Sequence, residues 1–282
     1  MVIVMKENIA LKIIYYTFLV LLVVFVIFPI FITIINSVRF QDAEIYTFTQ
    51  KISLHTFLPE TFTLKHYYRL FVENKFWLPV LNSTIVSIAT VVLGFLVNGL
   101  AGFAFAKFNF KGKNFLFFLF LFSFMIPFEA IAIPLYKISG FMLNTRTALI
   151  LPMVGNGMIV FLYRQFFLDI PDSLIDSARI DGAGSLRIFF ELITPLSIPV
   201  IISASLMMFI LQWDAFLWPI VAASNSNLKI IQVAISEFFG ENFTDWTLIY
   251  AATTIAIIIP TLILLPLQKY FIQGISSTGL KE

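Results

Sequence analysis

The sequence predicts an all-α integral membrane protein with six transmembrane helices. Hydrophobic residues make up 60% of its 282 residues, charged residues make up only 12%, and the mean hydropathy is +0.95. A soluble domain of this length carries about 25% charged residues, so this chain lacks the polar groups to cover a surface in water. Its apolar runs are continuous, as in membrane-spanning helices, and are too apolar for a disordered chain.

Stretches without a charged residue place the spans along the chain. A helix needs about 20 apolar residues to cross the hydrocarbon core, and five charge-free runs meet or approach that length. A sixth begins at Asn114 and is interrupted only by Glu129. Small residues from Gly99 to Ala106 predict close packing of the second span against another span or a partner permease. The spans are expected at about residues 13–36, 79–105, 115–135, 147–166, 195–218 and 248–270.

One membrane domain is expected, flanked by polar segments. Residues 1–76 comprise the first helix and a polar external loop from about residue 37, residues 77–271 form the transmembrane core, and residues 272–282 form a cytoplasmic tail. Within the external loop, residues 64–72 have the pattern of a short amphipathic helix. The first helix is expected to be retained, because its apolar run is longer than that of a signal peptide and no small-residue cleavage site follows.

The orientation follows from the basic residues of one short loop. Lys107, Lys111 and Lys113 lie in the loop 107–113, which has no acidic residue. Short loops rich in Lys and Arg remain in the cytoplasm. With six spans, both termini are then expected on the cytoplasmic side.

The residue types exclude several functions. The net charge of +2 is too small to indicate nucleic-acid binding. Cysteine is absent from the sequence, and the two histidines, His55 and His66, both lie in the external loop, so no metal site is expected. The glycine-rich P-loop pattern is also absent, which excludes that type of nucleotide site. Without a histidine or cysteine in any span, an intramembrane enzyme is not expected.

The loop between the fourth and fifth spans, about residues 169–195, carries the most specific pattern. Ser173 and Asp176 have the spacing of a capping box, which predicts a short amphipathic helix over residues 174–180. Gly182 then breaks the chain. A second helix follows, which Ser185 is expected to cap and which runs to about residue 193. By local pattern alone, the first helix either lies at the membrane interface or docks into a groove of a soluble partner.

The residues of this loop resemble the EAA loop of ABC importer permeases. Residues 177–183 read Ser-Ala-Arg-Ile-Asp-Gly-Ala, and the family pattern is roughly E-A-A-x-x-D-G-A, followed by an apolar helix and L-P-L-x-x-P. Asp176 stands where the family usually has Glu, and Ser177 stands where it has the first Ala. Pro195 and Pro199 match the two prolines of the pattern.

Matches beyond the loop extend the resemblance to about residues 64–282. These stretches resemble carbohydrate importer permeases of the maltose and multiple-sugar type. Such importers have two different permeases, and the C-terminal end of this chain resembles the second of them. The resemblance therefore implies the type I ABC importer permease fold. The matching stretches are Asn82–Ser83, Ile126–Pro127, Pro134–Tyr136, Leu143–Thr145, Arg164–Phe167, Ile170–Pro171, Trp213–Pro219 and Gln268–Phe271.

The resemblance implies a transporter of several chains. This permease would form a heterodimer with a second permease, and an ATPase dimer would hold the ATP and Mg²⁺. The chain itself would be no enzyme and would bind no cofactor. A periplasmic or extracellular solute-binding protein would deliver the carbohydrate to the outer face. The implied location is the bacterial plasma membrane, where the chain lies in lipid as a multi-pass protein.

The resemblance also implies that the loop docks its short helix into a groove of the ATPase. Closure of the ATPase dimer on ATP would then move the permease helices as rigid bodies. Gly182 would allow the sharp turn after the helix, and Asp176 would either pair with a basic residue of the ATPase or cap its own helix. The residues expected to dock are Asp176, Ser177, Ala178, Asp181, Gly182 and Ala183.

Polar residues within the expected spans are few, and they are the candidates for the solute path. Asp214 either lines the path or lies at the membrane interface and caps a helix end. Glu129 either lines the path or lies at its external mouth. Asn98 and Gln212 either line a hydrophilic route or form hydrogen bonds between helices. Trp213 suits stacking on a sugar face as well as the aromatic belt of the membrane. The path residues selected are Asn82, Gln212, Trp213 and Asp214.

Two rival functions are compatible with parts of the sequence. The docking loop is shared by ABC importers of other solutes, such as glycerol phosphate, peptides or polyamines, although the stretches Ile133–Tyr136 and Gln268–Phe271 favour carbohydrate. An ion-coupled secondary carrier would need buried coupling acids and usually has internal repeats. Neither is evident in this chain.

Overall fold

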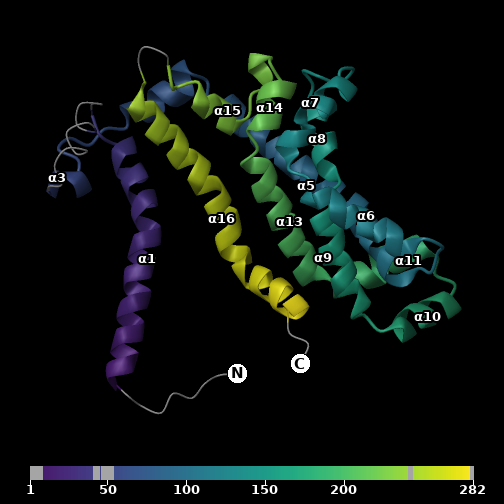
Figure 1. Cartoon of the computed structure of the whole chain (residues 1–282). Coiled ribbons are helices and arrows are strands. Elements are labelled where there is room, and N and C mark those ends of the chain that lie inside the picture. Colours follow the sequence, from purple (N-terminus) through teal and green to yellow (C-terminus); the bar gives the residue numbers. More distant parts are fainter. Residues whose placement is uncertain (1–8, 41–44, 46–53, 241–243, 280–282) are drawn as a thin grey trace. The chain divides into compact units, whose positions relative to one another are not determined.

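Figure 1 shows the computed structural model, in which residues 9–40, 45, 54–240 and 244–279 are described. Nearly all regular structure in these residues is helical. The longer helices are α1 (Ile9–Ser37), α5 (Trp77–Lys107), α6 (Lys113–Met125), α7 (Phe128–Ile138), α8 (Arg146–Val154), α9 (Gly157–Leu168), α13 (Ile198–Trp213) and α16 (Trp246–Gly279).

Shorter helical segments connect these elements. Two of them, η1 and η2, are π-helical, and η3 is a 3₁₀ turn. In chain order the segments are α3 (Leu54–Phe57), α4 (Lys65–Tyr68), η1 (Arg69–Glu73), α10 (Asp172–Ile180), α11 (Ser185–Ile188), η2 (Phe189–Ile193), α12 (Thr194–Leu196), α14 (Leu217–Ala222), η3 (Ser226–Leu228) and α15 (Ile231–Ser236).

The chain divides into two units, which are described separately. The first takes its described residues from Met1–Phe76 and Glu237–Ile257, and the second from Trp77–Ser236 and Ile258–Glu282. The first unit thus joins segments that are far apart in the sequence, which no local pattern indicated.

Three helices among the described residues are long and apolar enough to cross a membrane without a break. They are Leu11–Ser37, Trp77–Lys107 and Trp246–Tyr270, in agreement with the first, second and sixth expected spans. The other expected spans are pairs of helices that bend. α6 and α7 meet at 102°, α8 and α9 at 46°, and the segment Ser185–Leu196 meets α13 at 89°. The predicted count of six is reached if each bent pair crosses as one span.

Proline explains two of the three bends. Ile126 has extended backbone (φ −79°, ψ 119°), as expected for a residue before proline, and Pro127 is then the N-cap of α7. Ser197 leaves helical geometry after α12, and Pro199 occupies the first turn of α13. A hydropathy profile averages over such single residues, so it predicts the apolar stretch and not the bend.

α5 lies at the centre of the second unit, where it contacts α8, α9 and α13. A Cβ atom placed on Gly102 would lie 2.6 Å from the Cβ of Tyr163 on α9, so a larger residue could not be accommodated without moving the two helices apart. The predicted packing of the small residues of this helix against another span is confirmed. Beside this contact, α5 and α9 bury Phe103 and Phe167 against Phe189 of η2.

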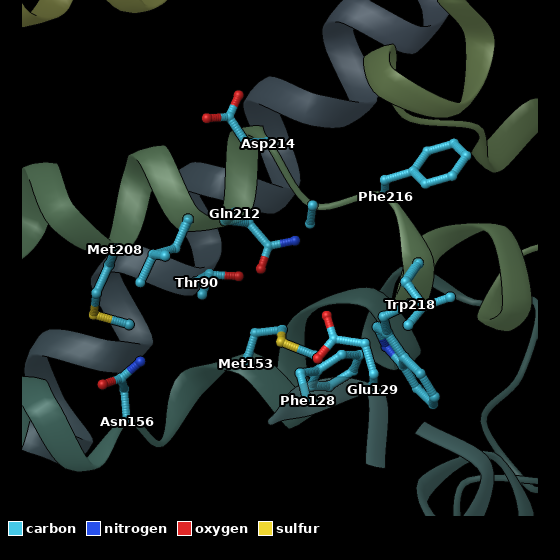
Figure 2. Close-up of a pocket in the computed structure, with 13 residues that line it drawn as sticks. Thr90, Phe128, Glu129, Met153, Asn156, Met208, Gln212, Asp214, Phe216 and Trp218 are labelled. Atoms are coloured by element: carbon cyan, nitrogen blue, oxygen red, sulfur yellow. The ribbon is translucent and has the colours of Figure 1, made fainter. Parts of the chain in front are cut away.

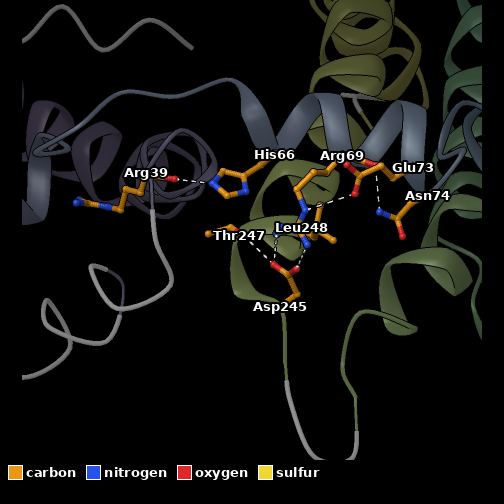
Figure 3. A network of polar contacts seen from close by, with 8 residues as sticks. All are labelled: Arg39, His66, Arg69, Glu73, Asn74, Asp245, Thr247 and Leu248. Carbon is orange, nitrogen blue, oxygen red and sulfur yellow. Dashed lines mark hydrogen bonds and ion pairs between the residues drawn. The ribbon is translucent and has the colours of Figure 1, made fainter.

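Polar contacts hold the first unit together (Figure 3). The predicted helix at residues 64–72 is present as α4 followed by η1, over residues 65–73. His66 is buried and its Nε2 lies 2.8 Å from the carbonyl oxygen of Arg39. Arg69 donates to Asp245 over 2.8 Å, which ties η1 to the segment before α16. Long-range polar contacts thus connect segments of this unit that are far apart in the sequence.

Asp245 is expected to stabilise the first unit in a pH-dependent manner. Burial raises the pKa of its carboxyl, but hydrogen bonds from Thr247, the Leu248 backbone and Arg69 lower the pKa further, so that it falls below its ordinary value. A carboxyl with a lowered pKa stabilises the fold above its unfolded pKa of about 3.9, and this stabilisation is lost as the pH falls through the folded value. Asp245→Asn should therefore lower the melting temperature at pH 7, and the difference from the parent chain should shrink as the pH falls below about 3.9.

Melting of the purified permease in detergent between pH 3 and 8 measures this difference. Glu73→Gln is the control, because Glu73 lies 3.8 Å from Arg69 with 58% of its side chain exposed, and exposed pairs contribute little. A difference between Asp245→Asn and the parent chain that does not change with pH would contradict the assignment.

Candidate functional site

The loop between α9 and α13 forms two short helices joined by a tight turn. α10 covers the predicted helix at residues 174–180 and begins two residues earlier, at Asp172. The second helix begins at Ser185 and continues through the π turn to Ile193, as predicted. The helix–turn–helix arrangement expected from the loop sequence is therefore present.

The predicted side-chain caps of these helices are wrong. Pro171 is the N-cap of α10, where no side chain accepts a hydrogen bond, and Ser173 lies inside the helix. Gly184 is the N-cap of α11, again without a side-chain cap, and Ser185 is the first helical residue. The φ of Pro171 is already helical at −59°, and the negative charge of Asp172 suits the first turn, so α10 begins without a capping box.

Gly182 makes the turn after α10. Its φ is +82°, a conformation that favours glycine. The amide of Gly182 donates to the carbonyl of Arg179 (3.0 Å), and the amide of Ala183 donates to the carbonyl of Ala178 (2.9 Å). These two bonds are those of a Schellman motif. The motif fixes the direction in which the chain leaves α10.

One face of α10 is buried and the other faces outward. Ile175 is 2% exposed and belongs to the aromatic core of the second unit. Asp176 is exposed and pairs with Arg179 at 3.3 Å within the same helix. Of the predicted docking residues, Ala178 and Ala183 are half-buried and the others are exposed: Asp176, Ser177, Asp181 and Gly182.

Exposed apolar residues at this tip were missed by the sequence analysis. Ile180 is 86% exposed and Leu186 is 64% exposed. The exposure of Ile180 could have been predicted from its position, because it lies five residues after Ile175 and so falls on the opposite side of an α-helix. The loop therefore presents an apolar tip flanked by charged residues.

A pocket of about 540 Å³ lies in the second unit, among α5, α7, α8, α13 and α14 (Figure 2). Two of its polar residues, Glu129 and Gln212, enter from α7 and α13, and Thr90 enters from α5. Phe128, Phe216 and Trp218 also line the pocket. Carboxylate, amide and hydroxyl groups thus lie beside aromatic rings in one cavity.

The pocket includes two of the four predicted path residues. Gln212 and Asp214 both line it. The side-chain nitrogen of Gln212 is buried and has no hydrogen-bond partner among the described residues, so it is available as a donor. Asp214 is the C-cap residue of α13 and accepts a hydrogen bond from Gln232 at 3.3 Å. Glu129 and Asn156 join them in the lining.

The other two predicted path residues lie outside this lining. The Asn82 side chain donates to the carbonyls of Asn227 (2.8 Å) and Lys229 (3.1 Å) and accepts from Arg146 (3.2 Å). Trp213 is 1% exposed and stacks on Phe209 with 5.5 Å between ring centroids. Both residues have packing and hydrogen-bonding roles within the second unit, and their place on a solute path stays a prediction.

Asn98 connects α5 to the break between α8 and α9. It is fully buried, and its Nδ2 donates to the carbonyl of Val154 over 2.8 Å. Its Oδ1 accepts from the amide of Asn156 over 2.9 Å. Non-helical backbone in a membrane requires such partners, because lipid offers none. Of the two roles left open for Asn98, hydrogen bonding between helices is the one observed.

Comparison with known proteins identifies the family. The family described as "Binding-protein-dependent transport system inner membrane component" matches residues 91–277. The chain belongs to this family. This permease is 33% identical over 228 residues to the arabinooligosaccharides transport system permease protein AraQ of Halalkalibacterium halodurans, covering 80% of this chain and 82% of that protein. It is 32% identical over 230 residues to the sn-glycerol-3-phosphate transport system permease protein UgpE of Salmonella typhi, covering 78% and 82%.

Solved structures show the same fold. A chain of a bacterial ABC transporter involved in import of the acidic polysaccharide alginate matches this permease with a TM-score of 0.81 and 21% identity, covering 94% of this chain and 98% of that one. A chain of the MetNI methionine ABC transporter matches with a TM-score of 0.55 and 16% identity, covering 72% and 98%. The predicted ABC importer permease fold is therefore confirmed.

Family membership decides between the function classes that the sequence left open. The permease is a component of a binding-protein-dependent transport system of the inner membrane, which agrees with the importer prediction and not with the secondary carrier. The family implies a partner permease, an ATPase and a solute-binding protein. Its apolar helices and its family together make it a multi-pass inner membrane protein.

Proposed function

We propose that this permease forms part of the import path for a neutral sugar or oligosaccharide. The observation that carries this proposal is the lining of the pocket. Its thirteen residues, all within the described chain, include the carboxylates Glu129 and Asp214 and no Lys, Arg or His. Hydroxyl groups of a sugar can donate to carboxylates and accept from the Gln212 amide, and the aromatic residues offer apolar faces to the sugar ring.

The same lining argues against a phosphorylated solute, although one of the relatives is named for glycerol phosphate. A phosphate monoester carries about −1.5 to −2 charges at pH 7, and proteins bind it with Arg, Lys or backbone amides. Two carboxylates on one pocket would instead repel it. An acidic polysaccharide would meet the same repulsion.

The energy for import would come from a partner ATPase that holds ATP and Mg²⁺, while this chain hydrolyses nothing. The ATPase would receive the outward face of α10 and the turn at Gly182, where the exposed tip residues Ile180 and Leu186 suit an apolar groove. A second permease would complete the path as a heterodimer. A solute-binding protein would deliver the sugar on the outer side, with both termini of this permease in the cytoplasm.

Uptake by the complete transporter in proteoliposomes tests the solute. Two permeases, the ATPase and the binding protein are reconstituted, and uptake of labelled neutral oligosaccharides is compared with uptake of labelled sn-glycerol 3-phosphate, with and without ATP. We expect ATP-dependent uptake of the neutral sugar only. Gln212→Leu should lower that uptake about tenfold, since one hydrogen bond to a hydroxyl is worth roughly 1–1.5 kcal/mol. Uptake of glycerol phosphate alone would overturn the proposal.

A further inference from the structure

Lys107, the last residue of α5, reaches across to the docking loop. Only 5% of its side chain is exposed. Its Nζ donates to the carbonyl of Ile170 over 2.6 Å and to the carboxylate of Asp172 over 2.7 Å. Ile170 and Asp172 flank Pro171, the N-cap of α10. One buried ammonium group therefore holds both sides of the point where α10 begins.

This use of Lys107 differs from the usual role of a lysine at a helix end, which is to bind the last carbonyls of its own helix. In this permease Lys113, the first residue of α6, binds the end of α5 instead. Its Nζ donates to the carbonyls of Phe108 (2.9 Å) and Ala106 (3.4 Å). Arg164 binds the carbonyl of Phe105 at 3.3 Å. Because Lys113 and Arg164 bind carbonyls at the end of α5, the Lys107 ammonium group can bind the start of α10.

Electrostatics at the contact agree with the geometry. The hydrogen bond from Lys107 and its charge hold the pKa of Asp172 below the ordinary range. Asp172 itself is 78% exposed, and exposed ion pairs contribute little by themselves. Breaking the bond from Lys107 to the Ile170 carbonyl is expected to cost more than breaking the pair with Asp172, because a carbonyl left without a partner in an enclosed place is costly.

α5 connects this contact to the pocket. The helix runs without a break from Trp77 to Lys107, and Thr90 on the same helix lines the pocket. Lys107 lies seventeen positions after Thr90, which corresponds to roughly 25 Å along the helix at 1.5 Å per residue. An unbroken helix of this length transmits a displacement at one end to the other.

We propose that Lys107 fastens α10 to α5, so that movement of the docking loop is transmitted along α5 to the wall of the pocket. Lys107 is thus a positioning residue that couples ATP hydrolysis to transport. The inference rests on the proposed docking of α10 on the ATPase. The aromatic packing around Ile175 keeps α10 against the core, and Lys107 sets where along α5 the start of α10 is held.

The test is the number of sugar molecules imported per ATP hydrolysed by the reconstituted transporter. Lys107→Met keeps the length of the side chain and removes its charge and donors. We expect the variant to retain the ATPase on purification and to hydrolyse ATP, while the import per ATP falls about tenfold. Lys107→Arg should restore most of this ratio, since a guanidinium still reaches both acceptors. Lys111→Met is the control, because Lys111 is an exposed lysine in the short loop after α5. Its import per ATP should equal that of the parent chain.

The outcomes separate this inference from the proposed function. An unchanged import per ATP in Lys107→Met would overturn the role of Lys107 while leaving the docking of α10 intact. Failure of the parent permease to retain the ATPase would overturn the docking itself. If Lys107→Met does not assemble, the ratio is measured on Lys107→Gln, whose shorter neutral side chain cannot bridge Ile170 and Asp172; a loss of about threefold or more supports the inference and an unchanged ratio overturns it.

Discussion

Replacing Asn98 with Leu is expected to destabilise the permease by about 2–4 kcal/mol, since each buried polar group left unpaired costs roughly 1–3 kcal/mol. The change leaves the carbonyl of Val154 and the amide of Asn156 without the partners that Asn98 now provides. Both groups lie at the break between α8 and α9, where the helical ladder cannot satisfy them. For a chain of this size the loss corresponds to a fall in melting temperature on the order of 5–10 °C.

The measurement is thermal unfolding of the purified permease in detergent. Ser87→Ala on the same helix is the matched control, because Ser87 is fully buried and its hydroxyl has no hydrogen-bond partner among the described residues. Removing that hydroxyl should leave the melting temperature unchanged or raise it slightly. If Asn98→Leu and Ser87→Ala had the same melting temperature, the idea that Asn98 stabilises the break between α8 and α9 would be refuted.

Gly182→Val is expected to abolish most of the binding of the partner ATPase. A β-branched residue at φ +82° is strained by about 1–3 kcal/mol, and the chain relieves the strain by leaving the Schellman turn. The direction of the loop after α10 then changes. A penalty of 1–3 kcal/mol corresponds to a loss of about 5- to 150-fold in affinity, which co-purification of the ATPase under mild detergent conditions measures.

Gly184→Val is the matched control for this prediction. Gly182 and Gly184 both face open space, so a larger side chain meets no obstacle at either position. The φ of Gly184 is −74°, which any residue adopts. Equal loss of the ATPase in both variants would show that side-chain bulk, rather than the turn, disturbs the contact. Retention in both variants would remove the support for docking through this turn.

The membrane class and the docking loop could be predicted from the sequence because both depend on local composition. A charge fraction of 12% excludes a water-exposed surface over the whole chain. Proline, glycine and amphipathic spacing lie within a few residues of one another in the loop, and they predict α10, the turn at Gly182 and α11. The predicted caps failed at this same scale, because Pro171 and Gly184 occupy the positions that were assigned to serine side chains.

The pocket could be predicted only in part. Asn82 and Gln212 are both amides in apolar spans, and the sequence treats them alike. In the fold, the Asn82 side chain donates to the carbonyls of Asn227 and Lys229. Gln212 instead lines the cavity with Glu129. A polar residue in a span can serve either role, and its neighbours on other helices decide which one it takes.

The sequence by itself determined that this protein lies in the membrane, which stretches of it are apolar enough to cross, and which loop carries the two short helices. These features follow from the transfer of side chains out of water and from backbone preferences within single turns. Only the tertiary structure decided where the spans break and which polar residues face the pocket. The break between α8 and α9 depends on Asn98, which lies more than fifty residues earlier on α5, and hydrogen bonds of that separation leave no trace in local pattern.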